Sequence, residues 1–135
     1  MFLMKDFNKK IVIVASVFGA ITIAIGAFGA HVLKEFISEK ALTSFETGVQ
    51  YQMYHVLAIL ILGFTDVIPS NTQKLVFRFF IFGIILFSGS IYFLSLNEIL
   101  PFNSDVLGFI TPIGGMFFII GWLQLGYCLH KSKSQ

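Results

Sequence analysis

The chain has 135 residues, of which 56% are hydrophobic and 12% are charged, and its formal net charge is +2. Soluble domains carry about 25% charged residues, so this composition excludes a water-soluble domain and predicts a single membrane domain over residues 1–135. The small net charge excludes a nucleic-acid-binding protein. The single cysteine, Cys128, excludes an intrachain disulfide and a cysteine-built metal site.

Four apolar stretches predict four helices that cross the membrane. The first, residues 11–30, contains no charged residue, and a bilayer core takes about 20 helical residues to cross. Short connections separate the stretches, so neighbouring helices are expected to pack antiparallel. The sequence predicts an all-α integral membrane four-helix bundle with spans near residues 11–30, 45–64, 75–96 and 106–129.

The first thirty residues also have features of a cleavable signal peptide. They begin with basic residues, and Ala27-Phe28-Gly29 resembles a small-residue cleavage site. The apolar core of a signal peptide is about 7–15 residues long, whereas this one has twenty. We therefore expect a retained first span.

Polar residues mark the helix starts. Thr43-x-x-Glu46 and Ser70-x-x-Gln73 have the form of capping boxes before the second and third spans. Asn103-Ser104-Asp105 offers capping residues before the fourth.

The connection between the first two spans has its own pattern. Apolar residues from Leu33 to Phe45 recur at helical spacing, with lysines and glutamates between them. This pattern predicts a short amphipathic helix in the membrane interface. A charged loop with a few anchoring aromatic residues is the alternative.

The distribution of basic residues predicts the orientation. The side of the membrane that holds the first and third connections between spans would carry only Lys34 and Lys40. The positive-inside rule therefore places both termini in the cytoplasm. The cytoplasmic side would carry the other seven basic residues: Lys5, Lys9, Lys10, Lys74, Arg78, Lys131 and Lys133.

Small residues recur four or seven positions apart within the spans. Helices in lipid associate through close packing, and small side chains permit it. A recurrence of seven keeps one seam facing its neighbour. The residues predicted to pack between helices are Gly19, Gly26, Gly29, Ala30, Gly83, Gly89, Gly114, Gly115 and Gly121.

Polar residues within the spans are the candidate binding residues, because lipid makes them costly. Tyr51 and His55 share one face of the second span, with Gln52 beside them, and His31 closes the first span. The functional hypothesis is a polar pocket open to the outer leaflet. The alternative is that these side chains hydrogen-bond between helices and fix their register. The full candidate set is His31, Glu46, Gln50, Tyr51, Gln52, His55, Ser88 and Tyr92.

The sequence gives little support for a metal site or for nucleophilic catalysis. Neither His-x-x-His nor Glu-x-x-His occurs, and Ser88 and Ser90 have no base at a recognisable spacing. We therefore expect no metal, no cofactor and no catalytic residue. Pro112 predicts a kink or loosened turn in the fourth span, and Trp122 and Tyr127 are typical of an aromatic belt.

Four motifs in order resemble a known family. They are GAFGAH at residues 26–31, TGVQYQMYH at 47–55, LFSGSIY ending at Tyr92, and PIGGMFFIIGW at 112–122. Together they resemble the domain-of-unknown-function 423 family, the transmembrane protein 256-like proteins. The resemblance implies a small four-span membrane protein and leaves the activity open.

The sequence thus predicts a multi-pass plasma-membrane protein with a binding or assembly role. The expected partner is a membrane lipid or other amphiphile, a partner membrane protein, or a second copy of the chain, and not nucleic acid. The alternative function is a small transporter or proton-conducting element that uses the same polar residues. An enzyme is the least favoured class.

Overall fold

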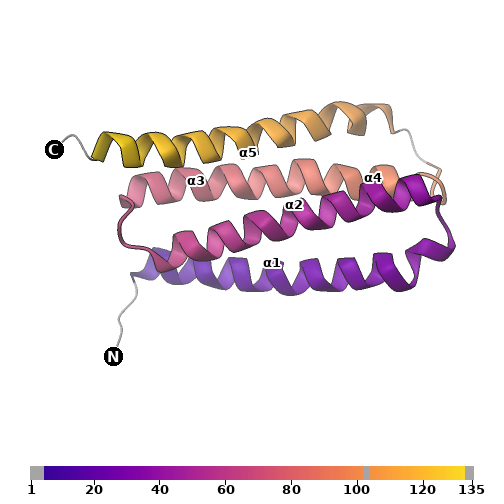
Figure 1. Ribbon diagram of the computed structural model, residues 1–135, viewed down its shortest axis with the longest axis horizontal. Helices are drawn as coiled ribbons and strands as arrows, with labels where there is room; N and C mark the ends of the chain where they lie inside the picture. The colour runs from indigo at the N-terminus through magenta and orange to yellow at the C-terminus, as the bar shows by residue number, and fades with distance from the viewer. Residues whose placement is uncertain (1–4, 102–103, 133–135) are drawn as a thin grey trace.

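The computed structural model describes residues 5–101 and 104–132. Helices joined by short connections account for these ranges, which confirms the all-α prediction (Figure 1). The segments α3 (Ser70–Gly83), η2 (Ile84–Ser88) and α4 (Gly89–Leu96) follow one another without a break and form one continuous rod. The elements are α1 (Asp6–His31), η1 (Leu33–Glu35), α2 (Glu39–Phe64), α3 (Ser70–Gly83), η2 (Ile84–Ser88), α4 (Gly89–Leu96) and α5 (Asp105–Ser132).

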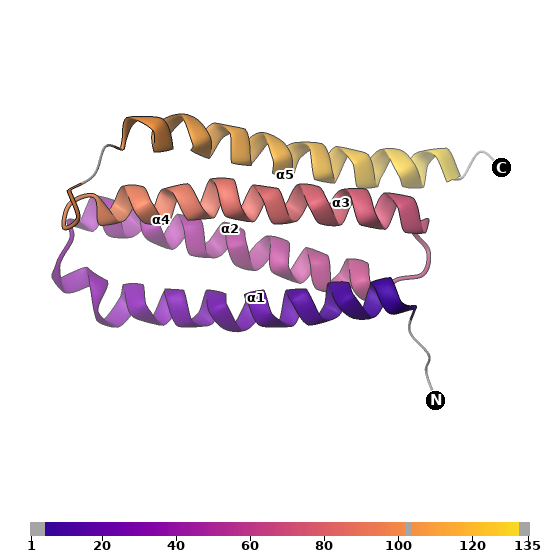
Figure 2. The ribbon, with the colours of Figure 1, turned by 180° about the vertical axis from the view of Figure 1, so that it is seen from behind.

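The second helix lies inside the bundle. In both ribbon views α1 forms one edge, α5 forms the opposite edge, and α2 and the α3–α4 rod lie between them (Figures 1 and 2). α2 packs against α1 and along the rod, and α5 packs against the rod. Apolar residues from all of these helices form the core: Ile11, Ala15, Val56, Ile59, Leu62, Val76, Phe80, Ile84 and Phe118.

The beginning of α1 and the end of α5 lie at the same end of the bundle (Figures 1 and 2). Lys5 forms an ion pair with Asp66 after α2, at 3.6 Å. The ammonium group of Lys74 lies 5.3 Å from the centre of the Phe7 ring. The start of α1 therefore lies beside the connection between α2 and α3.

Within residues 5–101 and 104–132, three segments are long and apolar enough to cross a membrane. They are Asp6–Glu35, Ser70–Leu96 and Val106–Lys131. Most of the apolar side chains on α1 and α5 face outward, where lipid would cover them. α2 is equally long, with 26 residues, but it is more polar than these three.

α2 begins earlier than the sequence predicts. Ser38 caps it, and its hydroxyl accepts a hydrogen bond from the Ala41 N–H at 3.2 Å. Thr43 already lies inside the helix, where its hydroxyl donates to the carbonyl of Glu39. The predicted capping box at Thr43 and Glu46 is therefore wrong, because Ser38 provides the cap one turn earlier.

The second predicted capping box is also wrong. Pro69 occupies the cap position of α3 without a side-chain hydrogen bond. The Gln73 amide instead donates to the carbonyls of Leu62 and Thr65, at 3.2 and 2.6 Å. It thereby satisfies carbonyls that the end of α2 leaves unpaired.

The start of α5 agrees with the predicted boundary. The Ser104 carbonyl accepts hydrogen bonds from the N–H groups of Leu107 and Gly108. Asn103, another predicted capping residue, lies outside the described residues.

The segment predicted as an interfacial helix is divided between two elements. η1 is a single turn over Leu33–Glu35, and α2 starts at Glu39. Leu33 is buried, while Phe36 is 64% exposed. The amphipathic pattern therefore covers a turn and the first residues of α2.

A loosened turn that the sequence did not predict lies in the third span. α5 continues through Pro112 from Asp105 to Ser132. The turn over Ile84–Ser88 is a π-helix, η2. A π turn within a longer helix redirects the side chains that follow it.

Most of the small residues predicted to pack lie against a neighbouring helix. A Cβ built on Gly29 would lie 2.7 Å from the Phe45 ring, and one on Gly121 would lie 2.6 Å from the Phe80 ring. A Cβ on Gly114 would overlap the backbone of Leu86 and Phe87. Gly19, Gly26, Gly83 and Gly115 also face side chains of a neighbouring helix within 4 Å.

Two of the predicted packing residues have different surroundings. A Cβ on Gly89 would meet no atom within 4 Å, and Ala30 is exposed. Gly48 and Gly63 were not among the predicted packing residues. A Cβ on Gly48 would lie 2.9 Å from the Tyr92 ring, and one on Gly63 would lie 2.7 Å from the Val12 side chain. Both lie on α2, because the central helix has close neighbours on several sides.

Candidate functional site

Gln52 lies at the centre of a hydrogen-bond chain that joins three helices. Tyr92 on α4 donates to its amide oxygen at 2.8 Å. Its amide nitrogen donates to the Thr22 hydroxyl at 2.8 Å, and Thr22 donates to the carbonyl of Phe18 on α1 at 2.6 Å. Gln52 is 4% exposed and Thr22 is fully buried. This chain fixes the register of α1, α2 and α4 in the way that interhelical polar contacts do in membranes.

Ser88 supports the same contact between helices. Its hydroxyl donates to the Gly48 carbonyl at 2.7 Å, and it is fully buried. The missing Cβ of Gly48 lets the Tyr92 ring lie against α2.

His55 lies among aromatic rings at the α2–α5 contact. Its ring stacks on Phe118, with 3.5 Å between ring centres, and Trp122 donates its indole N–H to His55 Nε2 at 3.1 Å. His55 Nδ1 lies 2.7 Å from the carbonyl oxygen of Tyr51. An indole N–H only donates and a carbonyl only accepts, so His55 is neutral with its proton on Nδ1. Trp122 therefore holds His55 in place, a role that the predicted aromatic belt did not include.

Of the remaining predicted residues, Tyr51 adjoins the rings around His55, and the other three do not join these clusters. His31 is exposed at the end of α1. Glu46 and Gln50 border a hollow of about 230 Å³ beside Gly26. The Tyr51 ring is 41% exposed and packs on Phe87, with 4.8 Å between ring centres. The structure thus brings together Gln52, Tyr92 and Ser88, holds His55 and Tyr51 nearby, and leaves His31, Glu46 and Gln50 apart.

A wide groove runs beside the Gln52 chain. It has a volume of about 510 Å³ and is bordered by α1, the η2–α4 segment and α5. Its walls are almost entirely apolar, apart from Gln52, Ser90 and Tyr92. Both the amide oxygen and the amide nitrogen of Gln52 already have a hydrogen-bond partner within the bundle, so this groove offers a ligand little specific polar recognition.

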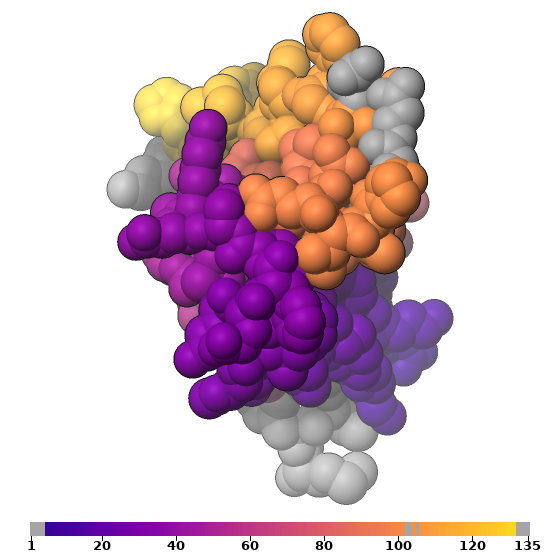
Figure 3. Space-filling view, turned by 90° about the vertical axis from the view of Figure 1, so that its right-hand side faces the viewer, coloured from indigo at the N-terminus to yellow at the C-terminus, as the bar shows by residue number. Residues whose placement is uncertain are grey.

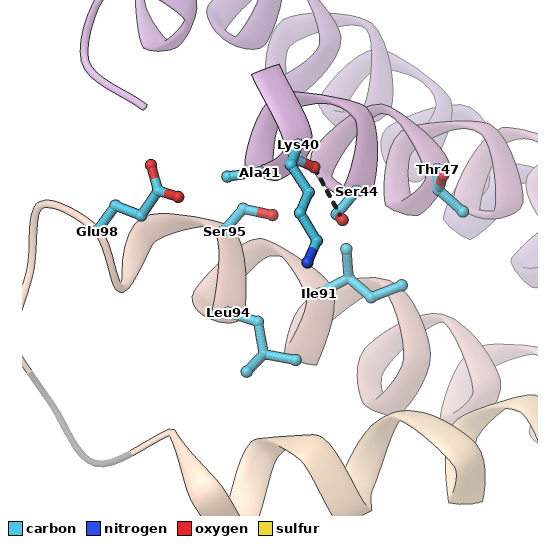
Figure 4. Close-up of a pocket in the computed structure, with 8 residues that line it drawn as sticks. All are labelled: Lys40, Ala41, Ser44, Thr47, Ile91, Leu94, Ser95 and Glu98. Atoms are coloured by element: carbon cyan, nitrogen blue, oxygen red, sulfur yellow. Dashed lines mark hydrogen bonds between the residues drawn. The ribbon is translucent and has the colours of Figure 1, made fainter. Parts of the chain in front are cut away.

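A different hollow combines apolar walls with polar groups that are available to a ligand. It is a crevice of about 400 Å³ between the first turns of α2 and the last turns of α4, hereafter the α2–α4 crevice (Figure 4). It lies at the end of the bundle opposite the start of α1 and the end of α5. Its lining residues are Lys40, Ala41, Ser44, Thr47, Ile91, Leu94, Ser95 and Glu98.

Ser95 is the most informative residue in the α2–α4 crevice. It is 2% exposed, and its hydroxyl is the only fully buried side-chain oxygen or nitrogen without a hydrogen-bond partner in the described part of the chain. Burying an unpaired hydroxyl costs about 1–3 kcal/mol. Figure 4 shows the hydroxyl directed toward α2, between Ala41 and Ser44. A donor is therefore available inside a hollow that is large enough for a small group.

Lys40 brings a positive charge to the same hollow. Its side chain extends from α2 toward α4, with the ammonium group near Ile91 and Ser44 (Figure 4). Among the described residues, no carboxylate oxygen lies within 4.0 Å of this ammonium group. The hydroxyls of Ser44 and Thr47 donate to the carbonyls of Lys40 and Thr43. Lys40 and Ser95 are thus the donors that remain available.

Glu98 closes the crevice at its outer end. Its two carboxylate oxygens accept hydrogen bonds from the Ser38 hydroxyl and the Ser38 N–H, both at 2.6 Å. The hydroxyl and, to a lesser extent, the N–H lower the pKa of Glu98, which is therefore a carboxylate at neutral pH. These bonds tie the start of α2 to the end of α4, and Figure 3 shows the two segments side by side at this end.

The residues of the α2–α4 crevice were not predicted as a site from the sequence. Lys40 belonged to the amphipathic segment, Ser95 followed an apolar run, and Glu98 marked a span end. Lys40 is more than fifty residues from Ser95 and Glu98 along the chain, so no sequence motif links them. The one available signal was the face of α2 on which Ser44 and Thr47 precede Tyr51 and His55 at helical spacing.

The described residues contain no group of three His, Cys, Asp or Glu side chains that could hold a metal ion. What the α2–α4 crevice offers is a cation, a hydroxyl donor, a carboxylate and apolar walls. This combination suits a ligand that is both polar and apolar.

The length and composition of the helices define an integral membrane protein. Residues 25–115 match the family model described as a protein of unknown function, DUF423. A UPF0382 membrane protein of Haemophilus influenzae is 40% identical over 94% of this chain and 98% of its own length. The chain belongs to this family, which confirms the resemblance found in the sequence.

Other relatives extend the comparison. The UPF0382 membrane protein YwdK of Bacillus subtilis is 39% identical and covers 87% of this chain and 93% of its own length. The UPF0382 inner membrane protein YgdD of Escherichia coli is 37% identical over 85% of both chains. No solved structure shows a significant match.

Proposed function

We propose that this protein binds a membrane lipid or other amphiphile in the α2–α4 crevice, at the outer face of the plasma membrane. The observation that carries the proposal is the buried, unpaired hydroxyl of Ser95 beside the unpaired ammonium group of Lys40. A ligand oxygen between α2 and α4 would satisfy both groups. The apolar side chains of Ile91 and Leu94 would adjoin the rest of the amphiphile.

The proposal includes four membrane-spanning helices. α2 is about 39 Å long at 1.5 Å per residue and packs along α1 and the α3–α4 rod, so it would lie at the same depth as they do. Its polar side chains do not prevent this, because Gln52 and His55 are hydrogen-bonded inside the bundle. A polar residue in a membrane span is tolerated when a neighbouring helix supplies its partner.

Charge supports an outer location for the crevice. Of the eight basic residues in the described part of the chain, six belong to the end where α1 begins and α5 ends, and basic residues favour the cytoplasmic side. Five of the seven acidic residues belong to the opposite end: Glu35, Glu39, Glu46, Glu98 and Asp105. Both termini would therefore lie in the cytoplasm, and the α2–α4 crevice would open to the outer leaflet. The E. coli relative is named an inner membrane protein, which supports the plasma membrane.

Lipid retention tests the proposal. The protein is purified in a mild detergent, and its bound lipid is counted by native mass spectrometry. Lys40→Gln and Ser95→Ala are expected to lose most of the lipid that the wild type retains. Lys34→Gln is the matched control, because it removes a positive charge at the same end but outside the crevice. A wild type without lipid, or equal retention in all variants, would refute lipid binding in this crevice.

Proton or small-solute conduction is the second candidate. One face of α2 carries Ser44, Thr47, Tyr51 and His55 from the crevice toward the middle of the helix, which favours a polar path. Beyond His55 the same face is apolar at Ala58, and both nitrogens of His55 are already engaged. Conduction through this path predicts that flux into proteoliposomes falls in His55→Ala. Equal flux in the variant and the wild type would remove this candidate.

A further inference from the structure

The α2–α4 crevice carries two opposite charges, and their arrangement points to one class of ligand. We infer that the crevice binds a zwitterionic phospholipid headgroup made of a phosphate and a primary ammonium group, as in phosphatidylethanolamine. This inference rests on the proposed function, because it names the ligand of the same crevice. Lys40 and Ser95 would hold the phosphate, and Glu98 would hold the ammonium group.

The phosphate end follows from the available donors. A phosphate oxygen accepts hydrogen bonds and carries negative charge, so it needs donors and a cation. Lys40 supplies three N–H donors and a positive charge, and Ser95 supplies an O–H that donates to no other group. Ser95 is 2% exposed, so its hydroxyl would bond only to a ligand group that inserts between α2 and α4 and not to one that rests on the surface. The start of α2 adds partial positive charge at the same position.

The ammonium end follows from the lone pairs that remain on Glu98. A carboxylate accepts about four hydrogen bonds, and each oxygen of Glu98 accepts one from Ser38. Each oxygen therefore retains capacity for one more donor. Among the described residues, Glu98 forms no ion pair with a basic side chain. Ser38 holds the carboxylate in place and leaves its charge available to a ligand cation.

The same groups discriminate between kinds of ammonium. A primary ammonium donates three hydrogen bonds and matches a carboxylate, whereas a quaternary ammonium donates none and is recognised by aromatic rings. None of the eight residues that line the crevice is aromatic. The crevice should therefore prefer phosphatidylethanolamine to phosphatidylcholine. The crevice should also prefer phosphatidylethanolamine to phosphatidylglycerol, because the phosphatidylglycerol headgroup has no cation to pair with Glu98.

A competition experiment tests the ligand class. The full chain is reconstituted in nanodiscs that contain equal amounts of phosphatidylethanolamine, phosphatidylcholine and phosphatidylglycerol with identical acyl chains. It is then released into mild detergent, and the retained lipids are identified by native mass spectrometry. Phosphatidylethanolamine is expected to exceed each of the other lipids by about two- to fivefold, the range for an exposed ion pair.

Two variants separate the charge of Glu98 from its structural contact. Glu98→Gln is expected to remove the preference for phosphatidylethanolamine while the total amount of retained lipid falls little, because Lys40 and Ser95 still hold the phosphate. Ser38→Ala removes the hydroxyl that bonds to Glu98 but keeps the carboxylate charge and the N–H bond that holds the carboxylate, so the preference should remain. Glu35→Gln is the matched control for charge, since Glu35 lies at the same end outside the crevice.

The outcomes distinguish the two proposals. Equal retention of phosphatidylethanolamine and phosphatidylcholine by the wild type would overturn the inference and leave lipid binding intact. An unchanged preference in Glu98→Gln would also overturn it. Absence of any retained lipid would refute the proposed function itself. Thermal unfolding of each variant in the same detergent confirms that the comparison concerns folded protein.

Discussion

The contact between α5 and the α3–α4 rod gives the sharpest prediction about stability. A Cβ added at Gly114 would lie 2.7 Å from the Leu86 carbonyl carbon and from the Phe87 Cα, and closer still to the Phe87 nitrogen. These are backbone atoms of a neighbouring helix, so no side-chain rotation can relieve the overlap. Gly114→Ala must therefore separate the two helices.

Gly115 provides the matched control in the next position. A Cβ there would meet only the Phe87 ring, at 3.7 Å, which is an ordinary van der Waals contact. Overpacking costs about 1–3 kcal/mol, whereas alanine in place of a helical glycine gains about 0.5–1 kcal/mol. We therefore expect Gly114→Ala to lower the free energy of unfolding by about 2 kcal/mol. Gly115→Ala should leave it unchanged or raise it slightly. Unfolding in mild detergent with increasing dodecyl sulfate measures both, and equal stability of the two variants would refute the packing of α5 described above.

Three further predictions concern polar contacts. Trp122→Phe should cost about 1 kcal/mol in the same unfolding assay, because the Nε2 atom of His55 loses its donor; no change would mean that the indole serves only as an interface anchor. Gln52→Leu should cost about 1–2 kcal/mol, because it leaves two hydroxyl groups on neighbouring helices without this partner; a more stable variant would contradict the hydrogen-bond chain. The lowered pKa of Glu98 contributes stability that is present above the ordinary glutamate range and is lost as the pH falls through the lowered pKa. The protection of backbone amides at the start of α2, near Ser38, relative to their intrinsic hydrogen-exchange rates at each pH, should therefore fall on acidification. Glu98→Gln should remove this dependence on pH, and an identical dependence in that variant would contradict the reasoning.

The helices could be predicted because their physical signal is local. A run of about twenty apolar residues has few alternatives to a membrane helix, and residues 11–30 contain no charged residue. The start of α2 was harder to find, because Ser38 caps the helix without the glutamate that completes a capping box. Thr43 and Glu46 match the pattern better, yet they lie inside the helix.

The candidate site could be predicted only in part, because its contacts join distant positions. The sequence identified Gln52 as a costly polar residue, but its partner Thr22 lies within an apolar run and gave no signal. Trp122 matched an aromatic belt, so its hydrogen bond to His55 remained hidden. Lys40 and Ser95 line the same crevice only because α2 and α4 pack side by side.

A structure determined with native lipid would show whether a headgroup occupies the α2–α4 crevice. We expect density between the first turns of α2 and the last turns of α4, with an oxygen within hydrogen-bond distance of both the Lys40 ammonium group and the Ser95 hydroxyl. A crevice that contains only water, or that is closed by its own side chains while lipid binds elsewhere, would contradict this expectation.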